Sequence, residues 1–205
     1  SDQPRHGPSA PYTPYTPKPS GSWLRRLLGL SWAWLFAGCW AQAPADPRAL
    51  DFAKNFSDHC LNSRANWSLK RDELNRRWRK LASPQSASFL SGQAGQAWHV
   101  PSVENEGNMV LSMGSKKEFC ALFARRAERL EAERLFQLLV ANSPPPWRVQ
   151  ALDEVWSGQG TERRHSLSYV WLDAQGQARW LFTLTTSEFE QPSIQALASV
   201  TSLGP

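Results

Sequence analysis

Histidine is the side chain of this sequence best suited to acid–base chemistry, because it titrates near neutral pH. The chain has four histidines. A hydrolase also needs a nucleophile and an orienting acid within hydrogen-bond reach. One grouping meets part of this requirement, because Asp153 and Glu154 lie across a predicted hairpin from His165. We favour ordinary cross-strand polar pairing, which contributes under about 1 kcal/mol, over a catalytic pair.

Motifs of known catalytic and metal centres are missing from the sequence. It has no G-x-S-x-G of a nucleophile elbow and no H-E-x-x-H of a zinc protease. No Cys/His spacing suits zinc. The Gly-rich loop 92–96 lacks the Lys-Ser/Thr of a phosphate-binding loop. We therefore predict no catalytic residue, no metal site and no cofactor, and we expect a protein that is not an enzyme.

Two cysteines lie in predicted elements of the folded part. Cys60 is on the apolar face of a helix that begins at Asp46-Pro47. Cys120 is in the strand 119–124, whose two faces are both apolar, as in the middle of a sheet. In an oxidising compartment the pair is expected to form a disulfide that stabilises the fold by up to about 4 kcal/mol. Two buried free thiols are the alternative, and neither cysteine has a catalytic signature.

The formal net charge of +5 raises the question of nucleic-acid binding. Part of the excess lies in residues 1–45, which carry one acidic residue, Asp2, and four basic ones, Arg5, Lys18, Arg25 and Arg26. The rest of the chain is therefore close to balanced. A domain that neutralises many phosphates needs a basic excess on one face. We expect no nucleic-acid partner.

Residues 1–22 form a Pro-rich tail without apolar periodicity, and we expect it to be disordered or extended. The chain begins with Ser1 and not with Met. We therefore expect either that the sequence is a fragment or that the tail is translated from sequence upstream of the true start codon. We leave it out of the fold prediction. Residues 46–205 are predicted to form a single domain.

Residues 23–45 have the layout of a secretory signal peptide. Arg25 and Arg26 precede the apolar run 27–38, and small residues follow it. The run is short for a membrane-spanning helix. A buried core helix is the alternative, but the arginine pair and the small-residue exit favour export.

The end of this signal has two interpretations. Residues 35–39 resemble the lipobox of bacterial lipoproteins, in which Cys39 becomes the acylated first residue. In the other interpretation, cleavage follows the A-x-A-like residues 41–43 or 43–45. A lipid on Cys39 would anchor the domain to a membrane without a spanning segment. We therefore expect a periplasmic or secreted protein or, as the alternative, a membrane-anchored lipoprotein.

A second helix, 68–81, is predicted to carry a basic face. Its members are Lys70, Arg71, Arg76, Arg77, Arg79 and Lys80. This face is the best candidate for contact with anionic lipid or a polyanion. Because charged helix faces are common, we favour a solvated surface over a binding site.

Hydrophobic periodicity predicts an α+β fold with N-terminal helices, a β-hairpin, one long helix and then an antiparallel β-meander, all in a single sheet. The long helix, 126–142, is expected to expose Glu133 and to bury a stripe formed by Leu130, Leu135, Leu138 and Leu139 and widened by Phe136 and Val140. The expected strands are 98–100, 109–113, 119–124, 147–156, 164–172 and 179–187. Residues 194–203 are predicted to form a last strand, with a helix as the alternative.

Four short patterns resemble a family of uncharacterised bacterial exported proteins and lipoproteins. They are Phe56-x3-Cys60-Leu61, Phe89-Leu90-x-Gly92-x2-Gly95-x-Ala97-Trp98, Cys120-Ala121-x-Phe123-Ala124-Arg125-Arg126 and Leu184-Thr185-Thr186-Ser187. The likeness covers most of residues 50–200. It implies export and one domain, and it transfers no activity and no catalytic residue.

Two functions stay open at this point. One is a binding or accessory protein of the cell envelope, which holds an unknown envelope protein or ligand on a sheet face or edge. The other is a small exported hydrolase with an unrecognised site. An exposed aromatic patch without convergent polar groups favours the first. A cleft that holds His99 or His165 beside a perturbed acid favours the second.

Overall fold

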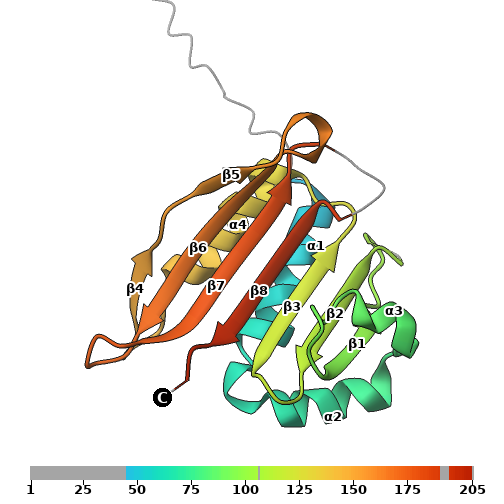
Figure 1. Cartoon of the computed structure of the whole chain (residues 1–205), viewed down its shortest axis with the longest axis horizontal. Coiled ribbons are helices and arrows are strands. Elements are labelled where there is room, and N and C mark those ends of the chain that lie inside the picture. Colours follow the sequence, from blue (N-terminus) through green and yellow to red (C-terminus); the bar gives the residue numbers. More distant parts are fainter. Residues whose placement is uncertain (1–44, 106, 190–193, 205) are drawn as a thin grey trace, which may run out of the picture. The chain divides into compact units, whose positions relative to one another are not determined.

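A computed structural model describes residues 45–105, 107–189 and 194–204 of the chain. These residues form four α-helices and one antiparallel sheet of eight strands (Figure 1). The predicted α+β class and the single sheet are confirmed. Cys39, the predicted tail and nearly all of the predicted signal lie outside the described residues.

The N-terminal helices begin where the sequence predicts a cap. Helix α1, Pro47–Phe56, starts after Asp46, whose carboxylate accepts a hydrogen bond from the backbone N–H of Arg48. The chain continues through the π-helical turn η1, Ser57–Leu61. The remaining helical segments before the sheet are η2, Arg64–Asn66, α2, Trp67–Arg77, and α3, Ser83–Ala87.

Every pairing between the strands is antiparallel. They are β1, Gly95–His99, β2, Met109–Gly114, β3, Phe119–Ala124, β4, Arg148–Ala151, β5, Val155–Ser157, β6, Arg164–Leu172, β7, Ala178–Ser187, and β8, Ala196–Ser202. Their order across the sheet is β1-β2-β3-β8-β7-β6-β4, with β5 also paired to β6.

Strands β3 and β8 hold the middle of the sheet. All six residues of β3 are buried, which confirms the prediction from its two apolar faces. The segment 194–203 contains a strand and not a helix, and β8 pairs with β3 on one side and β7 on the other. The last strand of the chain therefore joins β1–β3 to β4–β7.

Helices α1 and α4, Arg129–Ala141, pack on one face of the sheet (Figure 1). The core between them contains the fully buried aromatic side chains of Phe52, Phe56, Trp171 and Phe182. A disulfide between Cys60 in η1 and Cys120 in β3 joins this layer to the sheet, with the two Cα atoms 5.4 Å apart. The predicted cysteine pairing is confirmed.

The orientation predicted for α4 is wrong at Leu130, Leu138 and Glu133, whereas Phe136 and Val140 are buried as predicted. Glu133 is only 8% exposed, whereas Leu130 is 60% and Leu138 51% exposed. Ala132, Phe136 and Val140 face the core with Glu133. Hydrogen bonds described below keep the Glu133 carboxylate in this layer.

Two predicted elements end early. The predicted helix 68–81 stops at Arg77, because the chain turns to an extended conformation at Trp78 and pairs with β1. Leu81 donates its backbone N–H to Ala97, and His99 donates to Arg79. The predicted strand 147–156 is interrupted, so that β4 and β5 pair with different parts of β6.

The face of the sheet opposite α1 and α4, called the open face below, has two different halves. On β6 and β7 it carries hydroxyl pairs, such as Ser166 with Thr185 at 2.9 Å. On β2 and β3 it is apolar, and Phe89 and Leu90, which follow α3, pack there against Phe123. The apolar half contains the candidate site.

Candidate functional site

A row of three side chains forms the floor of a pocket on the open face. His99 of β1 is paired in register with Val110 of β2, which is paired with Phe123 of β3. Cross-strand partners in adjacent strands present their side chains on the same face. The sheet register therefore places an imidazole, an isopropyl group and a phenyl ring side by side.

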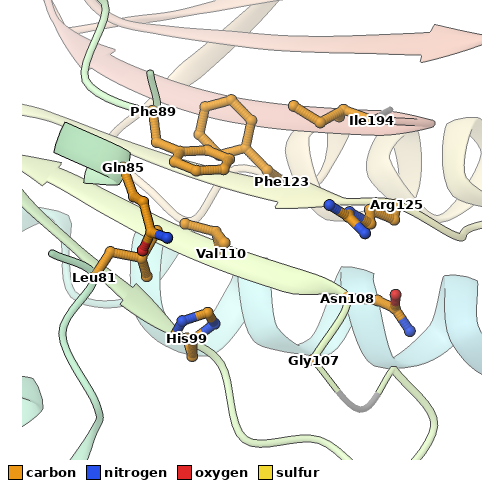
Figure 2. A pocket seen from close by; sticks show the side chains of 10 residues that line it. All are labelled: Leu81, Gln85, Phe89, His99, Gly107, Asn108, Val110, Phe123, Arg125 and Ile194. Carbon is orange, nitrogen blue, oxygen red and sulfur yellow. The ribbon is translucent and has the colours of Figure 1, made fainter. Parts of the chain in front are cut away.

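The walls of this pocket come from distant parts of the sequence (Figure 2). Phe89 stands edge-on to Phe123, with ring centroids 5.0 Å apart. The other lining residues are Leu81, Gln85, Gly107, Asn108, Arg125 and Ile194. The pocket is open to solvent on one side and has a volume of about 430 Å³, within the range of small-molecule sites. The pocket is lined mainly by apolar and aromatic groups, and none of the described residues that line it is acidic.

Arg125 supplies the only full charge among the described residues that line this pocket. It follows β3, where its backbone N–H donates to the carbonyl of Asn108 at 2.9 Å. Its side chain makes no ion pair or hydrogen bond with any described residue. Figure 2 shows the Arg125 guanidinium turned toward the apolar side chains of the pocket. The pocket thus combines an apolar body with one cation.

His99 links this pocket to a second hollow of about 590 Å³. Burial, together with the charge of Arg79, lowers the pKa of His99, so its ring is neutral at pH 7. No described group makes a hydrogen bond to its buried Nδ1 atom. The second hollow is also lined by Arg77 and Arg79, and its described lining again includes no acidic residue.

The predicted basic face is divided by the structure. Lys70 pairs with Glu73 at 3.0 Å, and Arg77 pairs with the same carboxylate at 3.1 Å. Arg71 donates to the backbone carbonyl of Gly114. Arg79 and Lys80 lie beyond the helix, on the extended segment beside β1, whereas Arg76 stays on α2 and is exposed. The six residues therefore do not form one helix face.

The acid–base grouping predicted around His165 is present in an altered form. Glu154 Oε2 lies 3.4 Å from Nε2 of His165, but Nε2 has no hydrogen-bond partner among the described residues. Asp153 is exposed on the interrupted strand. The main partner of His165 is Glu133, which the sequence pattern does not indicate and whose carboxylate accepts from His165 Nδ1 at 3.0 Å.

Glu133 organises a buried polar cluster between α4 and the sheet. Its carboxylate also accepts from Thr186 Oγ1 at 2.6 Å and from the guanidinium of Arg129 at 3.1 Å. Buried polar groups persist when they are hydrogen-bonded in this way. The cluster explains why a glutamate occupies the inner side of α4.

The cluster lacks two requirements of a hydrolase. The Thr186 hydroxyl donates to Glu133 and makes no hydrogen bond to the ring of His165, so no nucleophile is paired with the base. His165 is only 6% exposed, and Trp156 stacks on it with ring centroids 4.3 Å apart. The geometry supports a structural role for His165.

Some signal for the pocket was present in the sequence. Phe89, Phe123 and Arg125 all occur in the patterns that carry the family resemblance. Nothing in the chain's local periodicity, however, indicates that these three side chains meet. The contact depends on where the loop after α3 crosses the sheet.

Comparisons with family models, with curated proteins and with solved structures gave no match to this chain. The resemblance to exported proteins therefore stays a prediction. Within residues 45–105, 107–189 and 194–204, no helix combines the length and apolar character needed to cross a membrane. In the same ranges, no three His, Cys, Asp or Glu side chains are grouped to hold a metal ion.

Proposed function

We propose that this chain is an exported, non-enzymatic binding protein of the bacterial cell envelope, and that it holds an apolar group of its ligand in the open-face pocket. The observation that carries this proposal is the pocket itself. It has a floor of His99, Val110 and Phe123 and a mainly apolar lining, and none of the described residues that line it is an acid that could act with His99. Such a site is suited to binding and not to bond cleavage.

Export is supported by the disulfide between Cys60 and Cys120, because such bonds persist in oxidising compartments. The signal-like layout of residues 23–45 agrees with it. We place the protein in the periplasm or outside the cell, or on a membrane if Cys39 is acylated. The alternative, a small exported hydrolase, has less support because His165 is covered by Trp156 and lacks a nucleophile.

The pocket can be tested with an apolar fluorescent probe. We expect Nile red to bind the full-length chain and to show enhanced emission. The substitution Val110→Phe fills the floor of the pocket and should remove this signal. The matched control is Leu181→Phe, an aliphatic-to-phenyl change on the same face of the sheet but outside the pocket.

Circular dichroism should show that both variants keep the fold. The proposed function is contradicted if Nile red does not bind the unmodified chain. It is also contradicted if a folded Val110→Phe variant binds the probe as well as Leu181→Phe does.

A further inference from the structure

We infer that the natural ligand of this pocket is a single-chain amphiphile with an anionic head, such as a long-chain carboxylate. This inference rests on the proposed function and adds the chemical class of the ligand. The tail would lie between Phe89, Phe123 and Val110. The head would pair with the guanidinium of Arg125 at the end of β3.

The first support is the state of the Arg125 side chain. Arginine side chains that stabilise a fold are usually paired, as Arg129 is with Glu133 and Arg179 with Asp173. Arg125 is exposed and has no such partner among the described residues, and it lies beside an apolar cavity. A carboxylate is the group that a guanidinium binds best, through two parallel charge-assisted hydrogen bonds.

The second support is the sign of the surrounding charge. The adjoining hollow adds Arg79 on the other side of His99, together with Arg77, which is paired with Glu73. Among the described residues that line the two hollows none is Asp or Glu, so these residues attract an anionic head and offer a cationic head no counter-ion. The ring of His99 is neutral and offers a hydrogen bond, not a charge.

The third support is the size and shape of the site. A cavity of about 430 Å³ accommodates one alkyl chain or small aromatic body, whereas a protein partner would require a surface of much greater area. The apolar residues supply the free energy of tail burial, roughly 0.8 kcal/mol for each CH₂ group removed from water. The cation then selects among ligands with equal tails.

Three probes with the same alkyl chain separate these contributions. Dodecanoate, dodecanol and dodecyltrimethylammonium would each displace Nile red from the full-length chain, at concentrations below micelle formation. We expect dodecanoate to bind about tenfold more tightly than dodecanol, the factor expected for one charge-assisted hydrogen bond. The ammonium compound should bind more weakly than the alcohol.

The variant Arg125→Gln should remove the preference for dodecanoate and leave dodecanol binding unchanged. Its matched control is Arg164→Gln, which deletes an exposed positive charge on β6, outside the residues that line either hollow. In the control, the preference for dodecanoate should remain. A retained preference in folded Arg125→Gln would overturn the assignment of the head group.

The outcomes distinguish the two proposals. Equal binding of dodecanoate and dodecanol would overturn the anionic head and keep the apolar pocket. Failure of all three compounds and of Nile red to bind would overturn the pocket as well. If dodecanoate fails while an apolar peptide with a free carboxyl end binds through Arg125, the ligand is a peptide and the amphiphile is excluded.

Discussion

Cys60 is covalently joined to Cys120, so the π-helical turn that ends the first helical segment is fixed to the central strand of the sheet. Both cysteines are fully buried. The bond spans 60 positions of sequence and encloses α2, α3, β1 and β2. Removal of this link should therefore affect the whole fold and not one loop.

We predict that the double change Cys60→Ala/Cys120→Ala destabilises the folded chain by about 2–4 kcal/mol, because the unfolded chain regains the freedom of a long loop. Denaturant unfolding with and without reducing agent will measure it. Reductant should lower the stability of the unmodified protein and leave the double variant unaffected. The bond would be contradicted if thiol titration of the denatured, unreduced domain found both cysteines free.

A second prediction concerns pH and His59, the residue before Cys60. Its ring lies edge-on to Trp78 at 4.6 Å, and burial, aided by the charge of Lys70, lowers its pKa from 6.5 to about 4. In the unfolded chain His59 takes up a proton below pH 6.5, whereas in the fold it stays neutral down to about pH 4. The stability is thus fully present above pH 6.5 and falls as the pH drops toward 4.

Because the His59 ring is partly exposed, we expect the loss over this range to be roughly 1 to 2 kcal/mol and not the full value of the shift. Urea unfolding at several pH values will test it. The variant His59→Gln, which cannot titrate, should lose less stability than the unmodified protein over the same range. Parallel pH profiles of the two proteins would show that His59 is not responsible.

Glu133 should be the most sensitive polar position of α4. The change Glu133→Ala leaves His165 and Thr186 without their shared acceptor in a buried layer, and we expect destabilisation of about 2–4 kcal/mol. Glu133→Gln keeps one acceptor oxygen and should cost less. Glu154→Gln is the control, because the side chain of Glu154 is 61% exposed, and thermal melts should show a change below about 0.5 kcal/mol.

Deletion of residues 1–45 should leave the melting temperature nearly unchanged. The cap residue Asp46 stays in the shortened chain, so α1 still begins correctly, and the deleted sequence offers no periodic apolar face. Scanning calorimetry of the two chains will decide this. A large loss of stability after the deletion would show that the segment belongs to the fold.

The exported product is expected to start between Cys39 and Asp46. The arginine pair, the apolar run and the small-residue exit motivate this prediction. Intact-mass measurement of protein recovered from a bacterial envelope fraction will identify the first residue. A diacylglyceryl increment on Cys39 would select the lipoprotein, and a product that still contains Arg25 would contradict export.

Local sequence patterns were enough to predict the elements that are defined by their own residues and not by distant contacts. Strand β3 is apolar on both faces because it is buried on both faces, so its position in the sheet follows from its composition. Asp46-Pro47 likewise defines the start of α1, since capping depends on adjacent residues only. Such features need no knowledge of distant contacts.

Long-range contacts decided the rest. In α4 the leucines are compatible with more than one buried side, and the hydrogen bonds of Glu133 to His165 and Thr186 select the observed one. The register of three strands and the path of the loop after α3 create the pocket. A single sequence gives no indication of either arrangement.

The position of β8 has a consequence for the order of folding during synthesis. The segment Ala196–Ser202 is the only described strand that pairs with both β3 and β7, so the sheet stays in two separate parts until this segment has left the ribosome. Long-range pairing of this kind delays folding. Under the proposed export, the same delay would keep β1–β3 and β4–β7 unjoined until Ala196–Ser202 has crossed the membrane.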